Sequence, residues 1–237
     1  MASDHILKRF DEDLERLNAT INEMGGLTES QFSKALTAVR ERDSQTAEEV
    51  IAEDPRVDAL DQAVQEQTVK LLALRQPMAN DLRVVLSSIK IAAALERIAD
   101  YAKNTAKRSI VLTQGSVPPS AVVGIDRLGR LVRTALKDVL DAFADDDVEK
   151  AHDVWTRDEE IDQVYTGLFR EILTYMMEDP RNISSCTHLL FMAKNIERAG
   201  DHVTNIAELV SFRSTGQSFA EARRKGSGAL YSTDATP

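Results

Sequence analysis

Leu95-Glu-Arg-Ile-Ala-Asp-Tyr-Ala-Lys-Asn104 and Ile196-Glu-Arg-Ala-Gly-Asp-His-Val-Thr-Asn205 are two copies of one pattern in this chain. Glu, Arg, Asp and Asn stand at the same four positions of both copies. Self-similarity of this kind is typical of an internal structural repeat. The sequence therefore predicts a protein built from two homologous halves.

A second, weaker match lies earlier in each half. Asp54-Pro-Arg-Val-Asp58 resembles Asp158-Glu-Glu-Ile-Asp162, and a proline follows each of them, at Pro77 and Pro180. Each half thus has an early Asp-x-x-x-Asp and a late Glu-x-x-x-Asp-x-x-x-Asn.

The periodicity of apolar residues predicts an all-α fold. Apolar side chains recur three and four positions apart, as in Phe32, Leu36 and Val39, and strand-like alternation is almost absent. The few Pro and Gly residues lie where helices are expected to end. We expect helices at 4–42, with or without a bend at Gly25-Gly26, and at 44–74, 79–112, 122–144, 148–177 and 183–211. Asp54-Pro55 falls inside the second helix and indicates either a kink or a local helix start.

Short connections between consecutive helices favour antiparallel neighbours. We therefore expect two pseudo-symmetric antiparallel three-helix bundles. The predicted divisions are residues 1–114 for the first repeat, 115–121 for a linker, 122–213 for the second repeat and 214–237 for a flexible tail.

The composition predicts a globular cytoplasmic protein. Of 237 residues, 43% are hydrophobic, which is enough for a core, and 29% are charged, while no apolar run is long enough to span a bilayer. The first residues become charged at once and lack the apolar stretch of a secretory signal. Cys186 is the single cysteine, which excludes an internal disulfide framework and suits a reducing compartment.

Net charge argues against nucleic acid as a partner. The chain has a formal charge of -10 and a pI near 5.0, so most of its surface would repel phosphate backbones. The basic triplet Arg223-Arg224-Lys225 has no interleaved aromatic residues, and we expect it to be solvated in the tail.

The repeated acids predict a metal site. Residues four apart on a helix are rotated by about 40° and rise by about 6 Å, so each late motif forms a stripe of oxygen atoms on one helix face. Two carboxylates at this spacing repel each other unless a cation lies beside them, and oxygen ligands suit Mg²⁺, Ca²⁺, Mn²⁺ or iron. The candidate ligands are Asp54, Asp58, Glu96, Asp100 and Asn104 in the first half and Asp158, Asp162, Glu197, Asp201 and Asn205 in the second.

Two structural alternatives stay open for these acids. The late motifs could be solvated helix faces whose charge Arg97 and Arg198 neutralise, and the early aspartates could be helix caps. The repeat favours a ligand role, since purely solvated positions have no physical reason to keep the same four residue types in both halves.

Machinery for catalysis is not visible in the sequence. The four histidines lie on separate segments, and no Ser-His-Asp set or Gly-rich phosphate loop accompanies them. A ferritin-like di-iron bundle needs two Glu-x-x-His motifs, and only Glu149-x-x-His152 fits. We therefore expect no enzyme; a metal-dependent phosphate-ester enzyme and a ligand-free helical scaffold are the rival interpretations.

Several stretches together resemble the PhoU family of phosphate-uptake regulators. They are Leu71-Leu-Ala-Leu-Arg-Gln-Pro-Met-Ala-Asn-Asp-Leu-Arg83, Ile89-Lys-Ile91, Leu95-Glu-Arg-Ile-Ala-Asp100 and the second-half motif running on to Glu208. The resemblance extends over about residues 3–216. It implies two three-helix bundles, commonly as a homodimer.

The function that this resemblance implies is negative regulation of phosphate uptake and of the phosphate-starvation response. The implied partners are the ATPase of a phosphate ABC transporter and the sensor histidine kinase of the phosphate two-component system, so the protein would meet membranes only through those complexes. Some family members bind iron or zinc through Glu/Asp-x-x-x-Asp motifs, which map onto the eight acids named above; manganese or magnesium also suits them, and no organic cofactor is implied. Ala99 departs from the Gly that many first motifs have and that Gly200 supplies in the second.

Overall fold

A computed structural model describes residues 2–113 and 115–219 of the chain. Its helices are α1 (Ala2–Glu41), α2 (Ser44–Arg75), α3 (Asn80–Leu112), α4 (Pro119–Asp145), α5 (Val148–Thr156), α6 (Asp158–Glu178) and α7 (Ile183–Thr215), with a short 3-10 helix at Pro180–Asn182. The described residues contain no strand, and the prediction of an all-α fold is confirmed.

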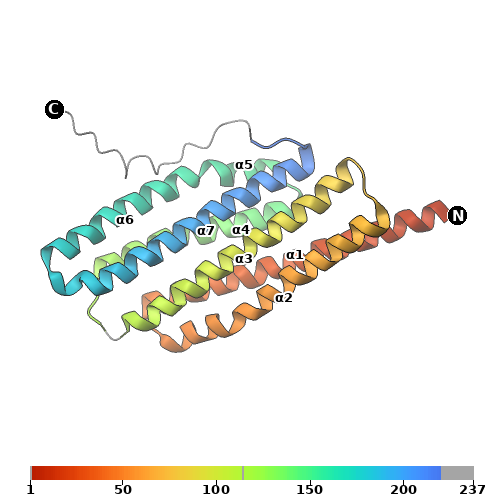
Figure 1. Ribbon diagram of the computed structural model, residues 1–237. Helices are drawn as coiled ribbons and strands as arrows, with labels where there is room; N and C mark the ends of the chain where they lie inside the picture. The colour runs from red at the N-terminus through yellow and green to blue at the C-terminus, as the bar shows by residue number, and fades with distance from the viewer. Residues whose placement is uncertain (1, 114, 220–237) are drawn as a thin grey trace.

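The helices form two groups that meet along α3 and α7. Figure 1 shows α3 and α7 side by side in the middle of the molecule, running in opposite directions, with α1 and α2 on one side, α5 and α6 on the other and α4 behind α7. The first half packs α1, α2 and α3 together, and α7 contacts α4, α5 and α6 in the second half. The last helix of each half therefore belongs to its own bundle and also to the junction between the halves.

Apolar residues at helical spacing form the core, as predicted. Phe32, Leu36 and Val39 are 2%, 5% and 5% exposed, and Leu95 and Ile196, which begin the two motifs, are 0% and 1% exposed. The motifs therefore start on buried residues and place their polar positions around them.

A second junction between the halves joins α1 to α4. A side chain on Gly25 would meet the Leu140 side chain at 2.5 Å, and one on Gly129 would collide with Leu36. Both glycines lie inside helices, where glycine costs about 1 kcal/mol relative to alanine. Close approach of the two helices explains why glycine stands there, and α1 passes Gly25 without a break in its helix.

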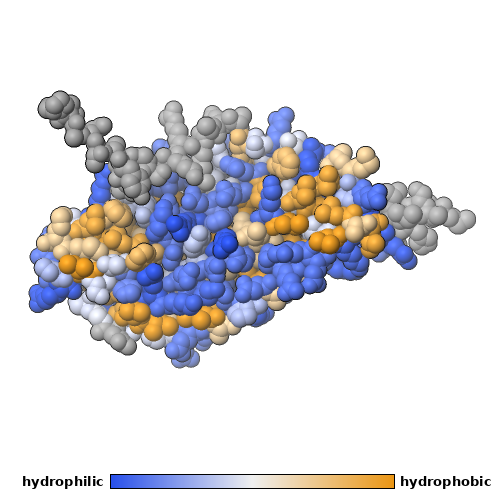
Figure 2. Space-filling model, in the orientation of Figure 1, coloured by the Kyte–Doolittle hydropathy of each residue, from blue (hydrophilic) through white to orange (hydrophobic). Residues whose placement is uncertain are grey.

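The surface is divided into polar and apolar zones. Figure 2 shows a mainly hydrophilic middle with hydrophobic residues gathered toward both ends. Leu74 and Met78 are exposed at the α2–α3 turn, and Met177 and Ile183 are exposed at the α6–α7 turn. Because α3 and α7 run in opposite directions, these two turns lie at opposite ends of the molecule (Figure 1).

Helix α2 is continuous through Pro55, so a local helix start at Asp54 is wrong. The helix starts after Asp43, whose side chain accepts from the backbone N–H of Gln45 at 2.9 Å. Proline lacks an N–H and so removes the donor to the carbonyl of Ile51. The remainder of this long helix is held by its packing on α1 and α3.

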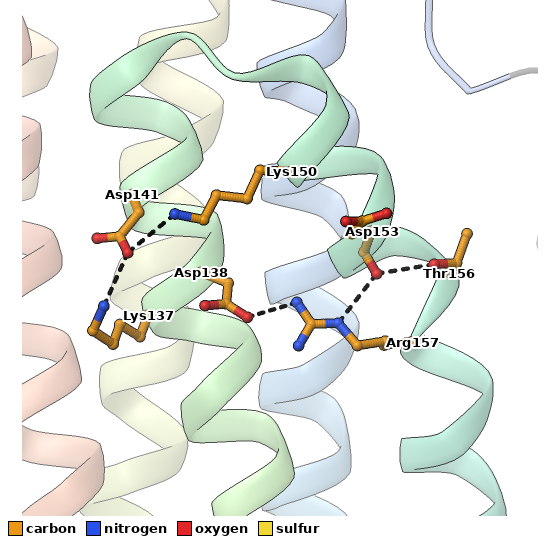
Figure 3. Close-up of polar contacts among 7 residues, drawn as sticks. All are labelled: Lys137, Asp138, Asp141, Lys150, Asp153, Thr156 and Arg157. Atoms are coloured by element: carbon orange, nitrogen blue, oxygen red, sulfur yellow. Dashed lines mark hydrogen bonds and ion pairs between the residues drawn. The ribbon is translucent and has the colours of Figure 1, made fainter.

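The single helix predicted at 148–177 is wrong, because the chain breaks at Arg157 into α5 and α6. The Arg157 side chain donates to Asp138 Oδ2 at 2.6 Å and to the carbonyl of Asp153 at 3.2 Å (Figure 3). Asp158, Glu159 and Glu160 then fill the first turn of α6, where carboxylates interact favourably with the helix dipole. Both features favour a new helix start at this point.

The link between the halves is fixed by Arg42. Its guanidinium donates to the carbonyls of Leu112, Thr113 and Gly115 at 2.5, 3.2 and 2.6 Å. These bonds satisfy carbonyls that the end of α3 leaves without helical partners. Residues 214–219 of the predicted tail include the end of α7, while residues 220–237 and the basic triplet lie outside the described part.

Candidate functional site

In the first half, one lysine joins the early and late acids. Asp54 of α2 is 5% exposed, and its Oδ2 lies 2.6 Å from Lys103 Nζ. The same Nζ lies 2.5 Å from Asp100 Oδ1 on α3. The predicted meeting of the two acidic motifs is therefore present, with an ammonium group between them.

In the second half, a hydroxyl occupies the corresponding place. Asp158 of α6 is 7% exposed, and its Oδ1 accepts a hydrogen bond from Thr204 Oγ1 at 2.9 Å. The carbonyl oxygen of Gly200 lies 3.1 Å from the same hydroxyl, so the two acceptors share its one proton. In the aligned motifs Thr204 stands where Lys103 stands in the first half.

These bonds decide between roles for the two buried aspartates. Asp54 lies in the interior of α2 and pairs with Lys103, so it is not an N-cap. Asp158 is the first residue of α6, and its side chain reaches α7. Asp54 thus joins α2 to α3, and Asp158 joins α6 to α7.

The outer acids of the first half are crowded. Burial raises the pKa of Glu96, and the charge of Asp100 raises it further. Burial also raises the pKa of Asp58, with Asp54 adding to the shift. Arg97 offsets part of this repulsion, since its guanidinium lies 3.5 Å from Glu96 and 3.7 Å from Asp100.

The second half repeats this crowding around Glu197, which is 8% exposed. Burial raises the pKa of Glu197, while Lys194, 2.7 Å away, opposes the shift and Asp201 and Asp162 add to it. Carboxylates of both helices thus act on one another in each half.

The two late motifs lie opposite each other across the α3–α7 junction. A groove of about 850 Å³ runs between these helices, lined by Lys90, Glu96 and Arg97 of α3 and by His202, Asn205 and Glu208 of α7. The rings of Tyr101 and His202 are 5.9 Å apart in the same region. We call this the α3–α7 groove.

The predicted asparagines have different surroundings. Asn205 lines the groove and Asn104 is exposed on α3. Their amides extend the acidic stripes along the surface, as the spacing predicted.

The chain near its described end closes one side of the groove. Ser218 lines the groove, and Phe219 packs edge-on against His152, with ring centroids 5.1 Å apart. Trp155 Nε1 donates to Glu208 Oε1 at 3.0 Å, which ties α5 to the groove wall.

Metal ligation in this structure is limited by the side chains already paired. Within residues 2–113 and 115–219, no three His, Cys, Asp or Glu side chains converge so that they could hold a metal ion. In the first half the ammonium of Lys103 lies where an ion shared by Asp54 and Asp100 would have to lie. The first-half residues, as placed, do not fit a metal.

Sequence reasoning missed Lys103 and the groove. The one signal for Lys103 was that a lysine in the first motif aligns with a threonine in the second. The groove needed the antiparallel packing of α3 on α7, which no local pattern reports.

No helix of the described residues is long and apolar enough to cross a membrane.

Comparison with known proteins gives consistent results. The chain is 47% identical over 223 residues to the phosphate-specific transport system accessory protein PhoU homolog of Caulobacter vibrioides, covering 94% of this chain and 97% of that one. It is 49% identical over 216 residues to the homolog of Rhizobium meliloti, covering 91% of each. It is 40% identical to the PhoU accessory protein of Escherichia coli, covering 91% of this chain and 89% of that one.

Solved structures agree with the sequence matches. The crystal structure of PhoU from Pseudomonas aeruginosa superposes with a TM-score of 0.86 at 38% identity, covering 88% of this chain and all of that one. The phosphate transport system regulatory protein PhoU from Streptococcus pneumoniae gives a TM-score of 0.81 at 30% identity, covering 90% of this chain. The PhoU domain profile matches twice, at residues 21–109 and 125–210. Two repeats, a matching fold and relatives similar over nearly the whole chain show that this chain belongs to the PhoU family.

Proposed function

We propose that this protein is an accessory protein of a phosphate-specific transport system and represses the phosphate-starvation response when phosphate is plentiful. The observation that carries the proposal is the similarity, over nine-tenths of the chain, to accessory proteins of that system. In this proposal the protein acts as a cytoplasmic adaptor between the transporter ATPase and the sensor histidine kinase.

The α3–α7 groove and its acidic stripes are the proposed contact face. Three features support this choice: both halves contribute residues to the groove, Arg97 and Arg198 are exposed beside the stripes, and the groove combines both signs of charge. Arranged charges steer association and select partners more than they add affinity. A face of this kind suits a partner that binds transiently.

Deletion of the gene tests the regulatory role. Phosphate-starvation genes should be derepressed in phosphate-rich medium, and the intact gene should restore repression. Normal repression in the deletion strain would contradict the proposal.

Complementation with variants tests the contact face. Replacement of the exposed Arg97 and Arg198 by Glu should weaken pull-down of the ATPase or the kinase and leave part of the response derepressed. A matched control replaces two exposed arginines on other faces, Arg16 and Arg127. Equal behaviour of both variants would assign the contact to another surface.

Metal binding at Asp158, Asp162, Glu197, Asp201 and Asn205 remains a prediction. Elemental analysis of protein purified without chelator, beside a Glu197→Ala, Asp201→Ala variant, tests it. Equal and negligible metal in both samples would leave these acids as structural or docking residues.

An enzymatic role in phosphate-ester chemistry has less support, because no three His, Cys, Asp or Glu side chains of the described residues converge to hold a metal ion for it. Assay of phosphatase activity with added Mn²⁺ and Mg²⁺ separates this alternative from the adaptor.

A further inference from the structure

Two acidic residues of the first half contact the positively charged side chain of Lys103. Lys103 Nζ lies 2.6 Å from Asp54 Oδ2 and 2.5 Å from Asp100 Oδ1, and its side chain is 20% exposed. Asp54 contributes from α2 and Asp100 from α3, so the ammonium bridges two helices. Hydrogen bonds between two charged groups at this length are among the strong ones in proteins.

The position of this ammonium is the one that a bridging metal needs. Carboxylate oxygens ligate Mg²⁺ at about 2.0–2.1 Å and Ca²⁺ at about 2.3–2.6 Å. An ion bound to both Asp54 and Asp100 would therefore overlap the Lys103 Nζ, and two positive charges a few ångströms apart repel strongly where water is scarce.

The rest of the first-half environment adds to this effect. Arg97 lies 3.5 Å from Glu96 and 3.7 Å from Asp100, so it places a second positive charge on the outer side of the same acids. Three of the four first-half acids thus touch a cationic side chain of α3.

The second half provides the comparison. Asp158 is buried to nearly the same degree as Asp54, yet Thr204 meets it with a neutral hydroxyl. A threonine at this position satisfies one carboxylate oxygen and adds no charge. The side chain at this position is thus charged in the first half and neutral in the second.

We infer that Lys103 is the resident cation of the first half and that it excludes divalent metal from Asp54, Asp58, Glu96 and Asp100. This inference departs from the sequence prediction of metal ligands in both halves. It concerns cation binding alone and does not depend on the proposed role in phosphate regulation.

Removal of the Lys103 ammonium would leave the carboxylates of Asp54 and Asp100 without the cation that bridges them. These carboxylates would then attract a different cation.

The test counts Mn²⁺ ions bound to the full chain, with free Mn²⁺ measured by electron paramagnetic resonance. A background with Asp158→Asn, Asp162→Asn, Glu197→Gln and Asp201→Asn removes the four second-half carboxylates, so that the first half is measured. With Lys103 in place, no Mn²⁺ should bind to this background up to millimolar concentration. Binding of one ion per chain there would overturn the inference.

Substitution of Lys103 provides the positive arm. Lys103→Thr, which copies the second half, should gain one Mn²⁺ per chain with affinity at least about tenfold above the background. Lys103→Arg, the matched control, keeps the charge and should gain none. A further Asp54→Asn in the Lys103→Thr chain should abolish the gained ion, which locates it.

Failure to gain an ion in a folded Lys103→Thr protein would overturn the inference, as would equal gain in Lys103→Arg. Circular dichroism checks folding of each variant. If the Lys103→Thr variant does not fold, the background protein that retains Lys103 still tests the inference. Mn²⁺ bound to that protein would contradict exclusion, and no bound Mn²⁺ would support it.

Discussion

The two halves of this chain each contain a buried aspartate, and they stabilise it with different side chains. Each buries one aspartate against its last helix, Asp54 of α2 at 5% exposure and Asp158 of α6 at 7%. The first half meets that carboxylate with the ammonium of Lys103, and the second meets it with the hydroxyl of Thr204. A duplicated fold can therefore keep its packing and its buried acid while the charge at the equivalent position changes.

The largest effect is expected from removal of the charge in the first half. Lys103→Met keeps most of the side-chain volume but leaves buried Asp54 without its cation, and breaking such a pair costs about 3–5 kcal/mol. Urea unfolding monitored by circular dichroism measures the loss, and Lys103→Arg should lose much less. A loss below about 1 kcal/mol would mean that the ammonium is not what holds Asp54.

A smaller effect is expected from the equivalent change in the second half. Thr204→Val removes the donor to Asp158 while keeping the shape of the side chain, which should cost about 1–2 kcal/mol. The same unfolding measurement applies, with Thr174→Val, an exposed threonine on α6, as the control. If Thr204→Val cost as much as Lys103→Met, the contrast between the halves would fail.

The pH dependence of stability in a Glu197→Gln variant tests a smaller effect in the second half. Burial raises the pKa of Glu197 in the folded chain, so the folded state binds its proton more tightly than the unfolded state does. The ionised carboxylate therefore destabilises the wild type at neutral pH, and this penalty fades as the pH falls through the raised pKa toward the unfolded value.

Glu197→Gln should consequently gain stability relative to the wild type at pH 7, with the difference shrinking as the pH is lowered from neutral toward about 4.5, the unfolded value. Unfolding of both proteins across this range measures the difference. A difference that grows at low pH would show that the ion pair with Lys194, rather than burial, dominates at this site.

The smallest effect is expected at the helix break, where the halves also differ. Arg157→Ala removes an ion pair whose side chains are 41% and 25% exposed, and such pairs contribute about 0.2–1 kcal/mol. Lys137→Ala, which removes a neighbouring exposed pair, is the control. Amide hydrogen exchange of the Arg157→Ala variant should still show a break in protection between α5 and α6. Continuous protection through both helices would show that Arg157 alone causes the break.

Much of this fold could be predicted from the sequence, because the spacing of apolar residues that identifies a helix is a local pattern. The spacing of Phe32, Leu36 and Val39 predicted buried positions that the structure confirms. The helix ends near Pro77 and Pro180 lay close to their predicted places. The break at Arg157 was missed, because one of the features that favour it is a bond to Asp138, which lies on another helix.

The site was predictable only in part for a related reason. The spacing of Glu96, Asp100 and Asn104 defines a stripe on one helix, and the repeat pointed to both stripes. Which cation lies beside Asp54 depends on the register of α2 against α3, and this register is set by packing over the whole bundle. The position at which the two repeats differ, Lys103 in the first and Thr204 in the second, was the sequence signal for this contact.

The antiparallel contact of α3 with α7 has a consequence for how the protein is made. Tyr101 meets His202, and Arg108 lies over the ring of Phe191, so these contacts join residues far apart in the sequence. Domains fold in order as they leave the ribosome, N-terminal part first. The first three helices therefore emerge with the α7-facing side of α3 still open to solvent. The groove comes into existence only after the last helix has been synthesised, so only chains translated through α7 can present it.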